Sequence, residues 1–247
     1  MISATVGSTN ITAFKKIVVC KVGQNIVLNN NRTSATSHTW DFGGGAGNTS
    51  DANPTVSWST PGTKDITYTP DIGRKELQKR FIVVLPDWST PDHTIVGQGN
   101  SMLVDGVSTT NSYINCLGWN PGEVVHISGN FTMSDRITFM GATGTEAKPI
   151  YIVNQGVVTI ACPGYENCVV MQGCKWVTMC GNTDPSEQYG FQLSQGIQAY
   201  GFNYNSEYQA WGLKFYGIDI NGQGVNGDCG IGFQIKAVNQ SYSADPA

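Results

Sequence analysis

The sequence has few charged residues, and this shortage limits the kinds of protein that it can encode. Asp, Glu, Lys and Arg make up 13% of the 247 residues, and the formal net charge is -4; globular proteins average about 25% charged residues. No basic block is present, which argues against nucleic acid as a partner. The polar surface must therefore come mostly from Asn, Gln, Ser and Thr. This composition predicts an all-β fold.

Long apolar runs are missing as well. No segment approaches the roughly 20 apolar residues that cross a bilayer, so we expect no membrane span. The first residues, MISATVGSTNITAFKK, lack the basic start and apolar centre of a secretory signal. Three explanations fit: a signal that was removed and replaced by Met, a cytoplasmic protein, or a virion protein assembled in the host cytoplasm.

The sequence also lacks the patterns of a metal site. It has seven cysteines but no CxxC pair, and its three histidines are scattered, whereas a structural zinc site needs paired spacing. Cys162, Cys168, Cys174 and Cys180 follow one another every six residues, an interval that does not match the repeat described below. We therefore interpret them as separate buried thiols and expect no cofactor. A structural calcium ion is compatible with the sequence, but nothing indicates one.

The first part of the chain contains short strand-like segments separated by turn residues, such as QNIVLNN, SHTWDF, TKDITYT and KRFIVVL. Strands at this density predict a small β-sandwich over residues 1–86. Trp40 and Phe42 are expected on one face of their strand and Asp41 on the other. No helix follows the glycine-rich stretch after Phe42, which excludes a phosphate-binding loop.

The first part also resembles a known family. Trp40-Asp41-Phe42-Gly43, Asn53-Pro54 and the stretch STPGT from residue 59 are similar to the PKD domain, an immunoglobulin-like sandwich. The chain departs from the family at Gly44, where an acidic residue is usual, and at Lys64, where an aromatic is usual. The resemblance implies a spacer or adhesion module and brings no catalytic residues.

After a proline-containing linker at residues 87–95, residues 96–247 contain a repeat. Pairs of apolar residues with one residue between them, such as Val177/Met179, Ile197/Ala199 and Ile218/Ile220, recur about every 20 residues, and a second column, including Ile150/Ile152, accompanies them. Because each short strand has period 2, the pattern predicts a right-handed parallel β-helix of about five coils. The last residues, KAVNQSYSADPA, form no convincing cap, so we expect the chain to be the N-terminal part of a longer protein.

A second resemblance covers this part. NPGEVVHISGN from Asn120 and GTEAKPI from Gly144 are similar to the segments that precede the first full coils of pectate-lyase-like β-helix proteins. Together with a PKD-like module, this resemblance implies a surface or secreted protein of the kind found in Bacteroidetes, or a phage spike.

The expected binding face follows from the predicted repeat. If the coils stack every 20 or so residues, the outward residues form one column, which comprises Thr138, Thr159, Thr178, Gln198 and Asp219. Trp176, Tyr200 and Asn221 flank it, and the loop YGFNYNSEYQAWG adds Tyr204, Tyr208 and Trp211. Aromatic rings and amide or hydroxyl groups suit a polysaccharide. The alternatives are a solvated sheet face and aromatic side chains packed on the coil below.

These observations favour a non-catalytic appendage over an enzyme. Lys214 and Asp219 are expected on different sheets, and no outward pair of carboxylates is evident. We expect an adhesion protein that is extracellular, on a cell surface or in a virion. Its expected partners are a polysaccharide or cell-surface glycan and other virion or anchoring proteins. A homotrimer is a further arrangement that the sequence leaves open. The alternative is the N-terminal part of a secreted polysaccharide lyase or glycoside hydrolase whose catalytic coils lie beyond residue 247.

Overall fold

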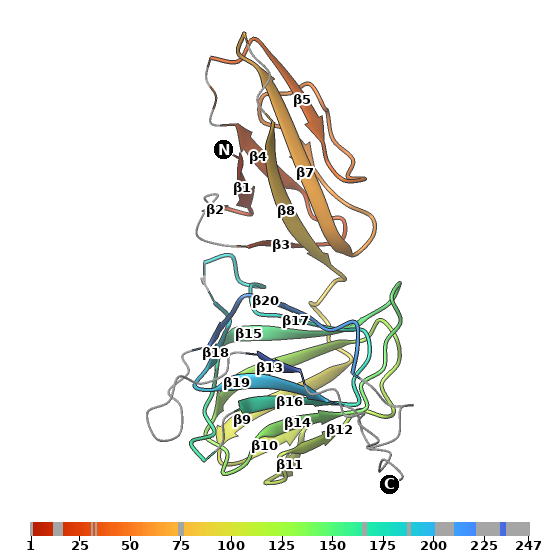
Figure 1. Cartoon of the computed structure of the whole chain (residues 1–247), viewed down its shortest axis with the longest axis vertical. Coiled ribbons are helices and arrows are strands. Elements are labelled where there is room, and N and C mark those ends of the chain that lie inside the picture. The colour runs from red at the N-terminus through yellow and green to blue at the C-terminus, as the bar shows by residue number, and fades with distance from the viewer. Residues whose placement is uncertain are drawn as a thin grey trace, which may run out of the picture. The chain divides into compact units, whose positions relative to one another are not determined.

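The structure is a computed structural model (Figure 1), and it describes residues 2–11, 17–30, 32, 34–73, 77–164, 167–186, 189–200, 210–220 and 233–235. These residues form strands, turns and bends but no helix. The chain separates into two compact units. The first comprises residues 1–90 with Asn182–Gln188, and the second comprises residues 91–181 and 189–247.

The first unit is a sandwich of two four-stranded sheets. One sheet has the order β2 (Thr9–Ile11), β1 (Ile2–Val6), β4 (Ile26–Asn30), β6 (Thr55–Val56). The other has the order β3 (Val18–Lys21), β8 (Gln78–Leu85), β7 (Gly62–Asp71), β5 (Ser37–Asp41). One apolar cluster takes residues from both sheets, including Leu28 from β4 and Tyr68 from β7. Each sheet therefore buries one face against the other, as alternating strand sequences require.

Aromatic residues fill much of the sandwich core. Trp40 and Phe42 are buried and Asp41 is exposed, which confirms the alternation predicted from the sequence. The Trp40 ring stacks on Tyr68 with the ring centroids 4.1 Å apart, and Trp58 Nε1 donates to the carbonyl oxygen of Phe42 at 2.7 Å. Trp40 Nε1 donates to the carbonyl oxygen of Asp51 at 2.9 Å, so both buried indole N–H groups of this cluster have an acceptor.

Two of the glycines after Phe42, Gly43 and Gly45, are required by close packing. The loop that contains them leads from β5 in one sheet to β6 in the other. Gly43 has a φ of +57°, and a Cβ there would lie 2.8 Å from the carbonyl oxygen of Asp65. A Cβ on Gly45 would lie 2.6 Å from Trp58 Nε1. The loop therefore connects the two sheets and packs against the core, where a side chain would not fit.

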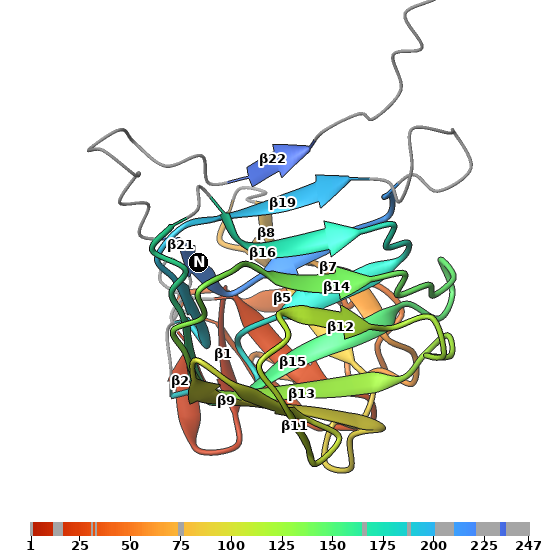
Figure 2. The same ribbon diagram turned by 90° about the horizontal axis from the view of Figure 1, so that it is seen from below.

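The second unit begins with β9 (His93–Gly99) and an antiparallel hairpin of β10 (Met102–Val104) and β11 (Val107–Thr109). From there on its strands pair in parallel, as Figure 2 shows for β12, β14, β16 and β19. The remaining strands are β12 (Tyr113–Asn115), β13 (Val124–Phe131), β14 (Ile137–Met140), β15 (Ile150–Ile160), β16 (Asn167–Gln172), β17 (Val177–Cys180), β18 (Phe191–Leu193), β19 (Gly196–Tyr200), β20 (Lys214–Tyr216), β21 (Ile218–Ile220) and β22 (Phe233–Ile235).

These strands form a β-solenoid of about four turns. The first ladder joins the beginnings of β13 and β15 to β17 and β20. The second joins the ends of β13 and β15 to β18 and β21, and the third runs β12, β14, β16, β19, β22. One apolar cluster fills the space between them. The predicted all-β fold with a parallel β-helix is therefore confirmed.

The prediction that one coil takes about 20 residues is wrong. Ile150 stacks on Val177 and Val169 stacks on Ile197, so a full turn takes well over twenty residues. Val177, Ile197 and Ile218, which the repeat placed in one column, lie in three different ladders. The reason is that every turn contributes three inward apolar pairs. Because the pairs look alike, their spacing along the chain reports the distance between ladders rather than between coils.

Candidate functional site

The predicted column of outward residues is divided among the three ladders. Thr138 and Gln198 lie in the third ladder, on either side of Val170. Thr159 and Asp219 lie in the second, on either side of Gln192. Thr178 lies in the first, beside Lys214. The single face predicted for these residues is therefore wrong, for the same reason as the repeat length.

Burial separates these residues further. Thr138, Thr178 and Gln198 are at most 5% exposed, and the Gln198 side chain accepts a hydrogen bond from Arg136 Nη1 at 3.2 Å. Asp219 is exposed. Asn221, Tyr204 and Tyr208 lie outside the described residues, as does the side chain of Tyr200 at the end of β19. A role of these residues in glycan binding stays a prediction.

Trp176 and Trp211, which the sequence placed in different parts of the surface, are neighbours at one corner of the β-helix. Trp211 lies beside Lys175 in a short parallel ladder that also contains Thr143. The backbone N–H of Trp176 donates to the carbonyl oxygen of Trp211 at 2.9 Å, and the backbone N–H of Trp211 donates to the carbonyl oxygen of Cys174 at 3.2 Å. We call Lys175, Trp176 and Trp211 the Trp corner.

Glycines allow this close approach. Gly212 follows Trp211 with a φ of +65°, and a Cβ there would lie 2.4 Å from Trp176 Cε3, so the Trp176 indole packs on the glycine backbone. Gly144 also needs to be glycine, because its Cβ would lie 2.6 Å from the carbonyl oxygen of Trp176. The GTEAKPI segment noted in the sequence thus provides the surface on which the corner is built.

The Trp corner presents an aromatic surface next to a cation. Trp211 is 54% exposed, Trp176 is half-buried, and Lys175 Nζ lies 5.1 Å from the centroid of the Trp211 ring. Trp176 has a φ of +52°, a left-handed conformation that is unusual for a bulky residue. Such conformations persist only where the surrounding structure enforces them, and they concentrate at functional sites.

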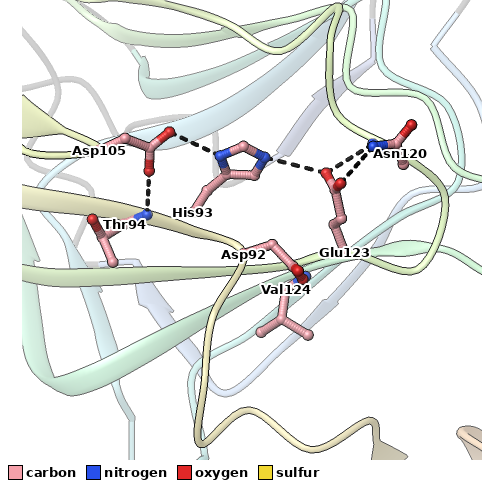
Figure 3. A network of polar contacts seen from close by, with 7 residues as sticks. All are labelled: Asp92, His93, Thr94, Asp105, Asn120, Glu123 and Val124. Carbon is pink, nitrogen blue, oxygen red and sulfur yellow. Dashed lines mark hydrogen bonds and ion pairs between the residues drawn. The ribbon is translucent and has the colours of Figure 1, made fainter.

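A second polar arrangement lies at the start of the β-helix (Figure 3). His93 Nδ1 is 2.8 Å from Asp105 Oδ2, and His93 Nε2 is 3.2 Å from Glu123 Oε2. The imidazole also stacks on Trp119, with the ring centroids 4.8 Å apart. We call His93, Asp105 and Glu123 the cap network, because they join β9, the β10–β11 hairpin and the turn before β13.

Tight turns hold both carboxylates of the cap network. Asp105 and Gly106 both have positive φ, 49° and 80°, between the paired residues Val104 and Val107, which is the geometry of a type I′ hairpin turn. The turn from Asn120 to Glu123 has Pro121 in second place and Gly122, with a φ of +96°, in third, as in a type II turn. The Asp105-Gly106 pair and the NPGE stretch from Asn120 are therefore sequence patterns that indicate these two turns.

The geometry makes the cap network a structural tie. Both ring nitrogens of His93 face carboxylate oxygens, so neither is directed at a substrate. Asp105 Oδ1 accepts from the N–H of Thr94 at 2.7 Å, and both Glu123 oxygens accept from Asn120 at 2.7 Å. Burial raises the pKa of Glu123, but hydrogen bonds from Asn120 and His93 lower it more, so the net pKa lies below its usual value.

Searches against known proteins give no relative for the chain. No protein-family model, curated protein sequence or solved structure matches it. Among the described residues, no cluster of His, Cys, Asp and Glu has the arrangement of a metal site. The same residues contain no helix long and apolar enough to pass through a membrane.

Proposed function

We propose that the protein is a non-catalytic surface appendage in which the β-helix binds a polysaccharide at the Trp corner. The observation that carries this proposal is the exposed Trp211 ring beside Trp176 and Lys175. Sugars present C–H faces that pack on indole rings and hydroxyl groups that accept hydrogen bonds from an ammonium group. The PKD-like sandwich is an attachment or spacer module in this proposal, and the protein acts outside the cell, on a cell surface or in a virion.

The position of the Trp corner supports binding rather than a purely structural role. The backbone of Lys175 and Trp176 forms hydrogen bonds with the preceding coil and with Trp211 in the following coil. The Trp176 ring packs on Gly212, so this indole is held in place before a ligand arrives. Preorganised aromatic side chains lose little conformational freedom on binding and supply much of the affinity at binding sites. The left-handed backbone of Trp176 would be accommodated more easily by glycine, which suggests that the indole itself is needed.

A panel of immobilised polysaccharides, measured with the purified protein, tests this proposal. Trp211→Ala should weaken binding to the recognised polysaccharide at least about 10-fold, since aromatic residues at the centre of a binding site typically contribute more than about 1.4 kcal/mol. Trp176→Gly should also reduce binding while the protein stays folded, because glycine suits the observed φ. Circular dichroism would verify the fold of both variants.

Trp88 provides a matched control. Its ring is also covered by a lysine, with Lys21 Nζ 4.9 Å from the ring centroid, but it belongs to the first unit. Trp88→Ala should leave polysaccharide binding unchanged. The proposal is refuted if the wild-type protein binds a polysaccharide and Trp211→Ala, Trp176→Gly and Trp88→Ala bind it equally well, or if it binds none in the panel.

The enzymatic alternative gains no support from the described residues. Lys214 lies in the first ladder and Asp219 in the second, on separate faces of the coil. Reducing-sugar and unsaturated-uronate assays on the same panel would detect hydrolase or lyase activity. Turnover that disappears in Asp219→Ala would favour the enzyme over the appendage.

A further inference from the structure

Lysine residues from three successive coils gather at the Trp corner. Lys175 belongs to the corner itself, and its Nζ lies 5.1 Å from the centroid of the Trp211 ring. Lys214 follows Trp211 by three residues in the next coil. It lies between Leu213 and Phe215, which both pack against the core, so its exposed side chain points outward.

Lys148 adds a third ammonium group from the coil before the Trp corner. A Cβ on Gly144 would lie 2.6 Å from the carbonyl oxygen of Trp176 and 2.9 Å from that of Lys148, so both backbones approach the same glycine. The Lys148 backbone is held in a turn, because its N–H donates to Thr145 Oγ1 at 3.0 Å and its carbonyl oxygen accepts from the N–H of Thr145 at 3.0 Å. Its side chain is exposed beside the corner.

The remainder of this part of the chain is acidic. Residues 91–247 contain twelve Asp or Glu residues but only five Lys or Arg residues. Three of these five cations form what we call the lysine column, which consists of Lys148, Lys175 and Lys214. Glu146 is the one acidic residue in the coil segments that carry the column, which are residues 143–150, 174–180 and 210–216. Positive charge is therefore concentrated at the exposed indole, although the surrounding sequence is negative.

We infer that the lysine column makes the Trp corner selective for a polysaccharide that carries carboxylate or sulfate groups. This inference rests on the proposed function, because it assigns the class of polysaccharide that binds at the same site. An ammonium group attracts an anion as a compact point charge with three N–H donors, whereas an indole packs on a sugar whether or not the sugar is charged. The acidic residues elsewhere in residues 91–247 repel an anionic chain and so direct it to the corner.

The exposure of the lysines determines the size of the effect. Water and salt screen exposed charges, so each lysine should contribute a factor of about 2 to 5 in affinity. The three lysines together should give the charged polysaccharide at least about a 10-fold advantage over its neutral form at low salt. This advantage should disappear at about 1 M salt, where the Debye length is about 3 Å.

Dextran, carboxymethyl-dextran and dextran sulfate test the inference, because they share one sugar backbone and differ in charge. Binding of the purified protein to each would be measured at low salt and at about 1 M salt. The charged forms should bind more tightly than dextran at low salt alone, and the tighter of the two identifies the anionic group. A wild-type protein that binds neither charged form more tightly than dextran overturns the inference. The proposed function is judged separately, by the effect of Trp211→Ala on the polysaccharide recognised in the panel.

Charge variants assign the selectivity to the lysine column. Lys148→Gln, Lys175→Gln and Lys214→Gln should each weaken binding of the charged form about 2- to 5-fold at low salt and leave binding of dextran unchanged. Glu146→Gln should strengthen binding of the charged form about 2-fold, because it removes the opposing charge. The matched control Lys79→Gln removes the same charge from an exposed lysine of the sandwich and should change neither. Equal losses in Lys79→Gln and the column variants would show that net charge alone sets the preference, which contradicts the inference.

Discussion

The sandwich and the β-helix bury their apolar residues in different ways. In the sandwich, a small number of large aromatic side chains, among them Trp40, Trp58 and Tyr68, lie in one cluster between two sheets. In the β-helix, smaller side chains such as Ile152 and Met179 repeat along the ladders, and each contacts chiefly the coils on either side. A substitution in the sandwich should therefore affect that whole unit, whereas one in the β-helix should act locally.

The largest effect that this contrast predicts is that of Trp58→Ala. Trp58 is 1% exposed and donates to the carbonyl oxygen of Phe42. Its removal leaves a cavity and an unpaired carbonyl group, and we expect a loss of about 4 kcal/mol in the free energy of unfolding. Hydrogen exchange measured by mass spectrometry should show faster exchange throughout β5, β7 and β8. Exchange that increases only next to residue 58 would contradict the cooperative behaviour expected of the sandwich.

Glu123→Ala should have an intermediate effect. The substitution removes the hydrogen bonds to Asn120 and His93 and leaves His93 with one carboxylate, for an expected loss of about 2 kcal/mol in the β-helix unit. The matched control is Glu146→Ala, since Glu146 is exposed and its removal should change the stability by less than about 0.5 kcal/mol. Chemical denaturation followed by fluorescence would compare the two variants, and equal stability would show that the cap network contributes nothing.

The stabilisation by Glu123 should depend on pH. Its pKa in the folded protein lies below the unfolded value of about 4.3, so its contribution is present above that value and is lost as the pH falls through the folded pKa. The difference in stability between the wild type and Glu123→Gln should therefore be constant near neutral pH and shrink in acid. A difference that grows in acid would contradict the assigned direction of the pKa shift.

The smallest effect should come from Ile152→Val. Loss of one buried methylene group from the first ladder should cost about 1 kcal/mol. Ile152 stacks on Val125 and Met179, so faster hydrogen exchange should be confined to β13, β15 and β17. A change that spreads to β19 and β22 would indicate that the β-helix is as cooperative as the sandwich.

The same contrast explains how much of the fold could be predicted from the sequence. Alternation marks which residues of a strand are buried, and it correctly assigned Trp40, Asp41 and Phe42. It also identified the inward pairs of the β-helix, since Val177 and Met179 are buried. It could not assign a pair to its ladder, because the lengths of the connecting loops vary and nothing in a pair distinguishes one ladder from another.

The candidate sites were harder to predict for the same reason. Trp176 and Trp211 were both named from the sequence, but their contact depends on the stacking of coils of unequal length. His93 was treated as one of three scattered histidines, although its partners lie in two turns whose sequences, Asp105-Gly106 and Asn120 to Glu123, are recognisable. Turn chemistry thus locates the two carboxylates, while only the fold shows that one imidazole lies between them.

The cap network has a consequence for the order in which the chain folds. His93 meets a partner 12 residues away and another 30 residues away, so a short stretch of chain is enough to close the first turn. Early closure over short distances has a low entropic cost, and the resulting strand edge is a template on which each later segment can pair. Folding is therefore expected to start at this end and proceed turn by turn, even while the ribosome is still producing the remainder.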